Sequence, residues 1–356
     1  MKRREFLTTI ERAGLGMAAG ALMTAGAGQA QAGSAPGRPS GSTEKATTGH
    51  RFRRAMYIPE LRLPFDEELA AAKEIGVDYV WFNRMLNETE IAQMSDAAAD
   101  RMAQRVEKQG LEIFLLNAGN PFKHVHLTDL DLKTMADHQG FKKDFEHLVR
   151  SMQIASRIGV GAVGAFTFAW PGEYSSGKPT WPMRWLTRGG VIAEVDMEKL
   201  VKAFTLVAEE AERYQVDVAL SMMPWNYTNT TGNFRSLVER VGSRRLTVMW
   251  GPADCWNCGE WDVATAGFSN IRPYLHGLHL KDLHVTDGRK LKFEYRPLGD
   301  GDVDYLTILR GMRDHGCDVF LSLATHFRPP SGSRVEAMKI NYRNLNEMIR
   351  KVEAEV

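Results

Sequence analysis

From residue 51 onward, short apolar runs alternate with longer stretches in which apolar residues recur every three or four positions. The short runs, rich in β-branched and aromatic residues, predict strands, and the longer stretches predict amphipathic helices. We predict strands at 54–58, 78–82, 111–116, 160–168, 216–222, 246–250, 275–280 and 318–323. We predict helices at 65–75, 88–109, 141–158, 196–214, 230–241, 261–270, 305–315 and 335–352.

Eight strand–helix units in this order predict a single (β/α)₈ TIM barrel. The alternative is an open, doubly wound sheet. Such a sheet is disfavoured because no Gly-rich phosphate-binding fingerprint follows any of the predicted strands.

The first 32 residues have the pattern of a targeting segment. Arg3 and Arg4 precede Phe6 and Leu7, a Gly/Ala-rich apolar run follows over 13–27, and a small-residue cleavage site lies at 30–32. The paired arginines resemble a twin-arginine export signal, which predicts a periplasmic or extracellular protein. An ordinary secretory signal and an uncleaved anchor are the alternatives, raised by the polar interruption at 11–12. The run is too short and too weakly apolar for stable membrane insertion.

Residues 33–50 are rich in Gly, Ser, Pro and Thr, which predicts a flexible linker, so the folded domain is expected to span 51–356. The 356-residue chain is 44% hydrophobic and 25% charged, with a formal net charge of +1. This near-neutral balance gives no reason to expect nucleic acid or an anionic membrane as a partner.

The strand predicted at 275–280 ends in candidate chemistry, with His279 followed by Lys281 and Asp282. Parallel barrels carry their active sites at the C-terminal ends of their strands. These three side chains are therefore candidates for the mouth of the barrel.

Several segments of the C-terminal third resemble the xylose-isomerase-like TIM barrels, the sugar isomerase/epimerase superfamily. Leu278-His279-Leu280-Lys281-Asp282 resembles the family's H-x-K-D strand, and the run at 297–304 resembles its P-L-G-x-G-x-V-D segment. The runs at 248–254 and 321–326 resemble its sixth and eighth strands. The element order of residues 54–352 agrees with this resemblance.

The resemblance implies a divalent metal, Mg²⁺, Mn²⁺, Zn²⁺ or Co²⁺, held by two glutamates, an aspartate and a histidine at the barrel mouth. The ion would polarise a sugar carbonyl while a carboxylate moves a proton. The corresponding positions here are Ser221, Gly251, His279 and Ala324. Only His279 is retained as a metal ligand, which puts the family's mechanism in doubt for this chain.

Other polar and aromatic residues at predicted strand ends could bind a small-molecule carbohydrate. Aromatic faces stack on sugar rings, while charged and amide groups bind hydroxyls. The candidates for substrate binding are Lys281, Asp282, Trp225, Trp256, His326 and Glu60. The structural alternative is that the tryptophans simply cover the barrel.

His279 and Asp254 form the preferred acid/base pair, because the sixth and seventh strands are neighbours. The alternatives are a buried His279 with a satisfied hydrogen bond, and a Lys281–Asp282 ion pair that only fixes the strand end. Cys255 and Cys258 could form a local disulfide, remain inert thiols, or join His279 in a displaced metal site.

Two functions remain open at this stage. The first is an isomerase- or epimerase-like enzyme acting on a carbohydrate or polyol with an altered metal site. The second is a non-catalytic carbohydrate-binding pseudoenzyme of the same fold. The long insertion at 171–195 is typical of a lid or a homo-oligomer contact.

Overall fold

The computed structural model describes residues 50–85, 89–170, 190–287 and 292–355. The chain divides into residues 1–47, which lie outside the described part, and a unit of residues 48–356. The predicted export signal and most of the 171–195 insertion therefore fall outside the described residues. In the part of the chain that is described, no helix has the length and hydropathy needed to cross a membrane.

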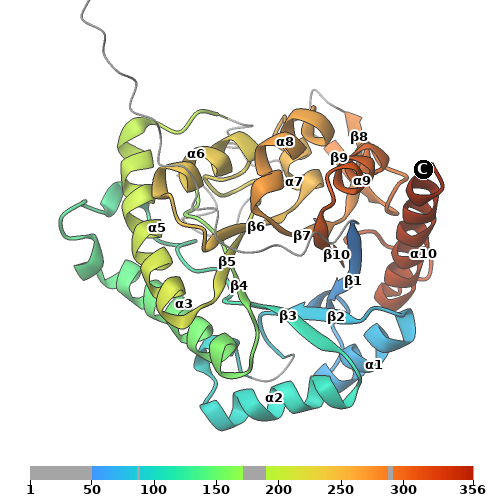
Figure 1. The fold of residues 1–356 in the computed structure, drawn as a ribbon, viewed down its shortest axis with the longest axis horizontal. Helices are drawn as coiled ribbons and strands as arrows, with labels where there is room; N and C mark the ends of the chain where they lie inside the picture. Colours follow the sequence, from blue (N-terminus) through green and yellow to red (C-terminus); the bar gives the residue numbers. More distant parts are fainter. Residues whose placement is uncertain (1–49, 86–88, 171–189, 288–291, 356) are drawn as a thin grey trace, which may run out of the picture. The chain divides into compact units, whose positions relative to one another are not determined.

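Eight parallel strands close into a barrel in the order β1-β10-β7-β6-β5-β4-β3-β2, with helices around the outside (Figure 1). The barrel strands are β1 (Arg51–Tyr57), β2 (Tyr79–Phe82), β3 (Glu112–Asn117), β4 (Ala162–Ala165), β5 (Asp217–Ser221), β6 (Leu246–Trp250), β7 (Leu275–Leu280) and β10 (Asp318–Leu323). This closed parallel barrel confirms the predicted (β/α)₈ fold.

Most described helices lie close to their predicted positions. The helix predicted at 88–109 begins only at Asp96, because Ser95 caps its N-terminus, and one helix was not predicted. The described helices are α1 (Phe65–Ile75), α2 (Asp96–Lys108), α3 (Gln139–Arg157), α5 (Glu194–Tyr214), α6 (Thr231–Val241), α7 (Pro252–Asn257), α8 (Phe268–Ile271), α9 (Tyr305–Asp314) and α10 (Arg334–Glu353). A π-helical turn, Val263–Gly267, precedes α8. The helix that was not predicted is α7, whose six residues are too few to show a helical period in the sequence.

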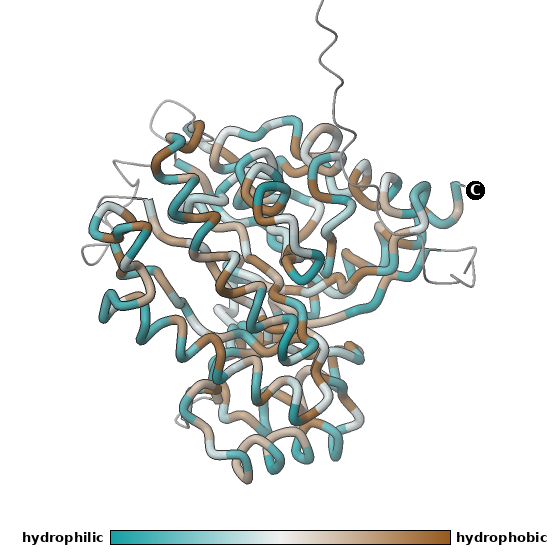
Figure 2. The backbone as a smooth tube through the Cα atoms, turned by 60° about the vertical axis from the view of Figure 1, so that its left-hand side comes forward, coloured by the Kyte–Doolittle hydropathy of each residue, from teal (hydrophilic) through white to brown (hydrophobic). Residues whose placement is uncertain are grey.

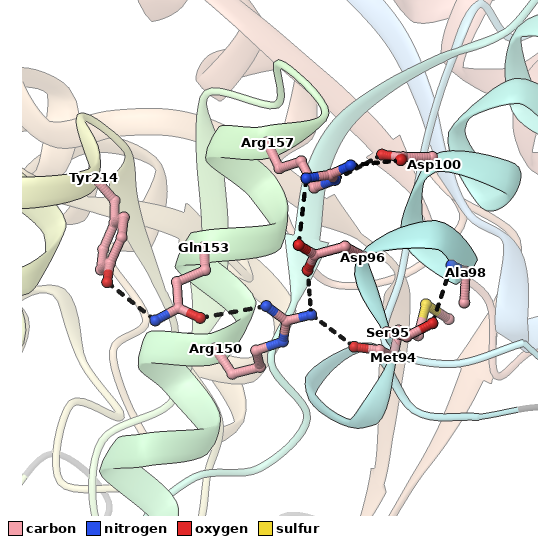
Figure 3. A network of polar contacts seen from close by, with 9 residues as sticks. All are labelled: Met94, Ser95, Asp96, Ala98, Asp100, Arg150, Gln153, Arg157 and Tyr214. Atoms are coloured by element: carbon pink, nitrogen blue, oxygen red, sulfur yellow. Dashed lines mark hydrogen bonds and ion pairs between the residues drawn. The ribbon is translucent and has the colours of Figure 1, made fainter.

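The helices alternate between hydrophobic and hydrophilic residues along their length (Figure 2), as expected of helices with one face against the barrel. Side-chain contacts also join neighbouring helices (Figure 3). Arg150 of α3 lies 2.8 Å from Asp96 of α2, and Gln153 of α3 donates a 3.0 Å hydrogen bond to Tyr214 of α5. Because Asp96 and Arg150 are partly exposed, we expect their ion pair to contribute little stability.

The barrel interior is filled by a cluster of alanine, aromatic and larger aliphatic residues that is separate from the main core. The cluster contains Ala55, Trp81, Phe114, Leu115, Ala162, Ala219 and Met249. Trp81 donates a 2.6 Å hydrogen bond from Nε1 to Ser322, and Ser322 is paired in register with His279 of β7. This packing brings His279 to the inner face of the barrel near its C-terminal end.

An antiparallel hairpin after β7 was not predicted. Its strands are β8 (Asp282–Asp287) and β9 (Lys292–Arg296), and they pair with each other outside the barrel sheet. The hairpin extends the chain at the C-terminal end of β7, where the candidate chemistry lies.

Candidate functional site

A cavity of about 400 Å³ opens at the C-terminal ends of β5, β6, β7 and β10. It is lined by Met223, Pro224, Trp225, Asp254, Asn257, Lys281, Leu283, Phe293, Tyr295 and His326. The hairpin supplies one wall, because Leu283 of β8 pairs with Tyr295 of β9 and both face the cavity with Phe293. The walls are largely apolar, and the charged groups gather on the β6–β7 side.

Lys281 and Asp254 form a buried ion pair in this cavity. Lys281 Nζ lies 3.0 Å from Asp254 Oδ2, and the side chains are only 3% and 7% exposed. Burial lowers the pKa of Lys281, but attraction to Asp254, Tyr295 and Glu60 offsets this and leaves it above the usual value. Burial raises the pKa of Asp254, while Lys281 opposes the rise. The predicted Lys281–Asp282 pair is wrong, since the partner of Lys281 is Asp254.

The absence of a side chain at Gly251 makes room for this pair. Gly251 precedes α7, and Asp254 lies in the first turn of that helix. A Cβ atom at position 251 would stand 2.5 Å from Asp254 Oδ2. The carboxylate of Asp254 therefore occupies the space that a side chain at position 251 would need.

His279 packs against aromatic rings inside the barrel. Its ring meets Trp81 edge-on at 5.4 Å and Tyr57 at 6.1 Å between centroids. Its Nε2 atom is buried and has no hydrogen-bond partner among the residues described. Burial, followed by the charges of Lys281 and His326, holds the pKa of His279 well below its usual value. Asp254 is paired with Lys281 and not with His279 in the described residues, so the predicted His279–Asp254 acid/base pair stays a prediction.

Glu60 and His326 meet on the β1–β10 side of the mouth. The backbone N–H of Thr325 donates to Glu60 Oε2 at 2.9 Å, and His326 Nε2 lies 3.8 Å from Glu60 Oε1. The Tyr295 ring packs against the His326 ring at 4.7 Å. Burial raises the pKa of Glu60 although Lys281 and the Thr325 amide oppose the rise. Glu60, Tyr295 and His326 thus extend the polar surface of the mouth beyond the Lys281–Asp254 pair.

Asp282 holds the hairpin in place and is not among the residues that line the cavity. Its carboxylate accepts hydrogen bonds from the backbone N–H groups of Leu283 (2.9 Å), Gly299 (3.0 Å), Gly301 (3.1 Å) and Val303 (3.4 Å). A Cβ atom at Gly301 would clash with this carboxylate. Asp282 therefore fixes both ends of the hairpin. It was predicted to bind substrate, but it does not line the cavity.

The two candidate tryptophans differ in position. Trp225 lines the cavity and packs against Phe166 with 5.2 Å between ring centroids. Trp256 is partly buried against the main core, and Asn257 lines the cavity beside it. Cys255 and Cys258 are buried thiols that are not joined in a disulfide, and Cys255 Sγ lies 3.3 Å from Met222 Sδ.

The sequence matches the family described as "Xylose isomerase-like TIM barrel" over residues 69–347. The chain belongs to this family. No curated protein matches the chain.

Solved structures of family-like barrels share the fold at low sequence identity. The IOLI protein, solved with a zinc atom, has a TM-score of 0.63 and 15% identity, and the match covers 84% of this chain and 99% of that one. An L-ribulose 3-epimerase has a TM-score of 0.62 and 15% identity, and the match covers 85% of this chain and 96% of that one. The D-psicose 3-epimerase of Clostridium cellulolyticum H10, solved with D-tagatose, has a TM-score of 0.59 and 15% identity. The match covers 84% of this chain and 99% of that one. At this identity the likeness shows the fold alone.

The residues at the four positions implied for the family's metal do not form a matching ligand set. Ser221 ends β5 with its hydroxyl buried and without a hydrogen-bond partner in the described part of the chain. Gly251 has no side chain, Ala324 has only a methyl group, and His279 is the single imidazole. Over the described residues, no group of three or more His, Cys, Asp or Glu side chains is placed to hold an ion. These donors do not fit a four-ligand divalent centre.

Sequence reasoning missed the hairpin residues Leu283, Phe293 and Tyr295. A signal for them was present, since apolar residues alternate with polar ones in both segments, at Leu283 and Val285 and again at Phe293 and Tyr295. This period of two predicts a hairpin with one apolar face. That face is the wall of the cavity.

Proposed function

We propose that this protein acts on a small carbohydrate or polyol at the C-terminal mouth of its barrel, as an isomerase- or epimerase-like enzyme. The observation that carries the proposal is the buried Lys281–Asp254 pair at the cavity wall. Buried charges are costly for a fold, and they concentrate where a ligand or a reaction uses them. A partly apolar cavity with a few convergent polar groups is the usual form of a small-molecule site.

The walls of the cavity support a carbohydrate as the ligand class. Trp225, Phe293 and Tyr295 offer aromatic faces for the C–H side of a sugar ring. Asn257, Asp254 and Lys281 offer donors and acceptors for its hydroxyl groups. The solved relatives named as 3-epimerases have names that imply sugar substrates, and this favours the same class here.

Two carboxylates support proton transfer at a sugar carbon. Burial raises the pKa of both Asp254 and Glu60, which moves each group towards the range in which a carboxyl exchanges protons at working pH. Both groups interact electrostatically with Lys281. We expect one of them to take a proton from the carbon next to a carbonyl.

A non-catalytic carbohydrate-binding protein is the second candidate. It is favoured by Ser221, Gly251 and Ala324, which place no acid or base at three of the four positions where the family implies one. The binding walls of the cavity would serve this function equally well. The two candidates differ only in turnover.

A panel of aldoses, ketoses and polyols tests the proposal. We expect saturable binding of one class by calorimetry, and uptake of deuterium from D₂O at a carbon next to the carbonyl by NMR. Binding without deuterium uptake or product would favour the second candidate. If no sugar or polyol binds, the proposal is wrong.

We also propose export by the twin-arginine route, on the basis of Arg3 and Arg4 in the first residues. Replacing both with Lys should leave the full-length protein in the cytoplasmic fraction, whereas the unaltered chain reaches the periplasm or medium. Export of the double variant at the original level would contradict the route.

A further inference from the structure

The charged centre of the mouth is built around an ammonium group. Lys281 follows His279 by two residues, so both side chains leave the chain on the same side of β7 and its extension. The Lys281 side chain lines the cavity and is almost completely buried. Asp254 is in contact with its ammonium group, and Glu60 and Tyr295 act on it electrostatically. A cation fixed in the chain therefore stands among oxygen atoms at the mouth.

We infer that the Lys281 ammonium binds and polarises a carbohydrate oxygen in this site, in the role that a divalent ion would otherwise fill. The inference rests on the proposed carbohydrate function. It goes beyond that function by identifying the group that holds the ligand oxygen and by making the site independent of metal.

The geometry around Gly251 supports this exchange of roles. The family resemblance implies an aspartate at position 251, directed at an ion. In this chain the carboxylate of Asp254 fills the space beside the Gly251 Cα and meets Lys281 instead. The acidic group nearest to position 251 thus lies in the first turn of α7, and its counterion is part of the polypeptide.

The electrostatics also act against a divalent ion at this place. An ion near His279 would lie close to the Lys281 ammonium, as it would in the family's H-x-K-D strand, where the resemblance implies negatively charged ligands that offset the repulsion. The positions that would compensate this repulsion with negative charge carry Ser221, Gly251 and Ala324. One neutral imidazole does not replace them.

The ammonium retains hydrogen-bonding capacity for a ligand. A lysine ammonium has three N–H donors. Asp254 is the one acceptor that contacts Nζ among the described residues, and the Lys281 side chain lines the cavity. A carbonyl or hydroxyl oxygen of a bound sugar can accept the remaining donors, which would stabilise negative charge developing on that oxygen.

The test combines metal and sugar titrations on metal-stripped protein. Full-length protein is treated with EDTA, its metal content is checked by mass spectrometry, and Mn²⁺ is titrated by calorimetry. Sugar affinity is then measured with EDTA and with excess Mn²⁺. We expect no stoichiometric Mn²⁺ binding and less than a twofold change in sugar affinity between the two conditions.

Substitutions identify the group responsible. Lys281→Met keeps most of the apolar length of the side chain, removes the ammonium and should weaken sugar binding at least tenfold. The exposed Lys292→Met serves as a matched control and should change nothing. Since Lys281→Met leaves Asp254 buried without its counterion, the double variant Lys281→Met/Asp254→Asn removes both charges and protects the test against misfolding. The double variant should also lose sugar affinity.

The outcomes separate the inference from the proposed function. Stoichiometric Mn²⁺ binding by the wild-type protein, or unchanged sugar affinity in both Lys281 variants, overturns the inference. Failure of every sugar to bind overturns the proposed function, and the role given to Lys281 falls with it. In that case the Mn²⁺ titration still decides whether the site excludes a divalent ion.

Discussion

Asp254 and Gly251 share one space at the end of β6. The carboxylate of Asp254 stands where the side chain of residue 251 would begin, with only 2.5 Å between Oδ2 and an ideal Cβ. The glycine is required by this close approach and not by backbone conformation, because its φ of −105° is open to any residue. The Lys281–Asp254 pair therefore depends on a residue that makes no side-chain contact itself.

We predict that Gly251→Ala displaces Asp254 and weakens the ion pair. The added methyl group cannot be accommodated without a shift, so the free energy of unfolding should fall by about 1–3 kcal/mol. Sugar affinity should fall with it, and both are measured by urea unfolding and calorimetry. Gly161→Ala is the control, since a Cβ at Gly161 meets nothing within 4 Å. If the two variants had equal stability and equal sugar affinity, the claim that Asp254 occupies the space of a side chain at position 251 would be wrong.

Asp282 is predicted to act on the cavity through the hairpin. Asp282→Asn replaces a charged acceptor of four backbone hydrogen bonds by a neutral amide that can accept fewer of them. We expect a loss of about 1–3 kcal/mol in unfolding free energy and faster amide hydrogen exchange in β8 and β9. The exposed Asp300→Asn, in the same loop, should leave both unchanged. A stable hairpin in Asp282→Asn would show that the carboxylate is not its anchor.

Trp225 is predicted to supply the stacking surface for the sugar ring. Trp225→Ala should weaken sugar binding by about 1–2 kcal/mol, roughly 5- to 30-fold, because an aromatic face is removed from the cavity wall. Trp261→Ala is the matched control, since Trp261 is 74% exposed and does not line the cavity. Calorimetric titration with the best sugar of the panel measures both. Similar affinities for the two variants would place the ligand elsewhere.

Glu68 of α1 is predicted to make stability depend on pH. Its side chain is fully buried, and burial raises the pKa of Glu68 to about 8 despite nearby backbone amides and Arg84. The folded protein therefore binds a proton at this site more tightly than the unfolded chain does. This contribution to stability is complete below the unfolded pKa of about 4.5 and is lost as the pH rises through about 8.

Substitution of Glu68 tests the direction of this pH dependence of stability. Glu68→Gln keeps the shape of the side chain and removes the titration, so the free energy of unfolding should fall less between pH 5.5 and pH 8.5 than in the wild-type protein. At pH 8.5 the variant should be the more stable of the two, by about 1–2 kcal/mol. The exposed Glu67→Gln should retain the wild-type slope. If the free energy of unfolding of Glu68→Gln fell more steeply with pH than that of the wild-type protein, the direction assigned to this pH dependence would be wrong.

The barrel could be predicted from the sequence because strand and helix periods are local signals. The predicted strand at 246–250 and the one at 275–280 match β6 and β7 as observed. The hairpin was missed because β8 follows β7 after the single residue Lys281, so the two strands read as one apolar run with a polar end. Helix α7 was missed because it is too short to show a helical repeat of apolar residues in the sequence.

The site was predicted less completely, because it depends on which side chains meet across neighbouring strands. The sequence indicated that Lys281, Asp254, His326 and Trp225 belong at the mouth, and all four line the cavity. It could not show that Lys281 pairs with Asp254 and not with Asp282. That choice is made by the space at Gly251 and by the amides around Asp282, both of which are tertiary features.

A crystal structure grown with the bound sugar and excess Mn²⁺ tests the central claim most directly. The account predicts a sugar oxygen within about 3 Å of Lys281 Nζ, the ring against Trp225, and no metal at His279. A Mn²⁺ ion coordinated by His279 and bridging to the sugar would contradict it.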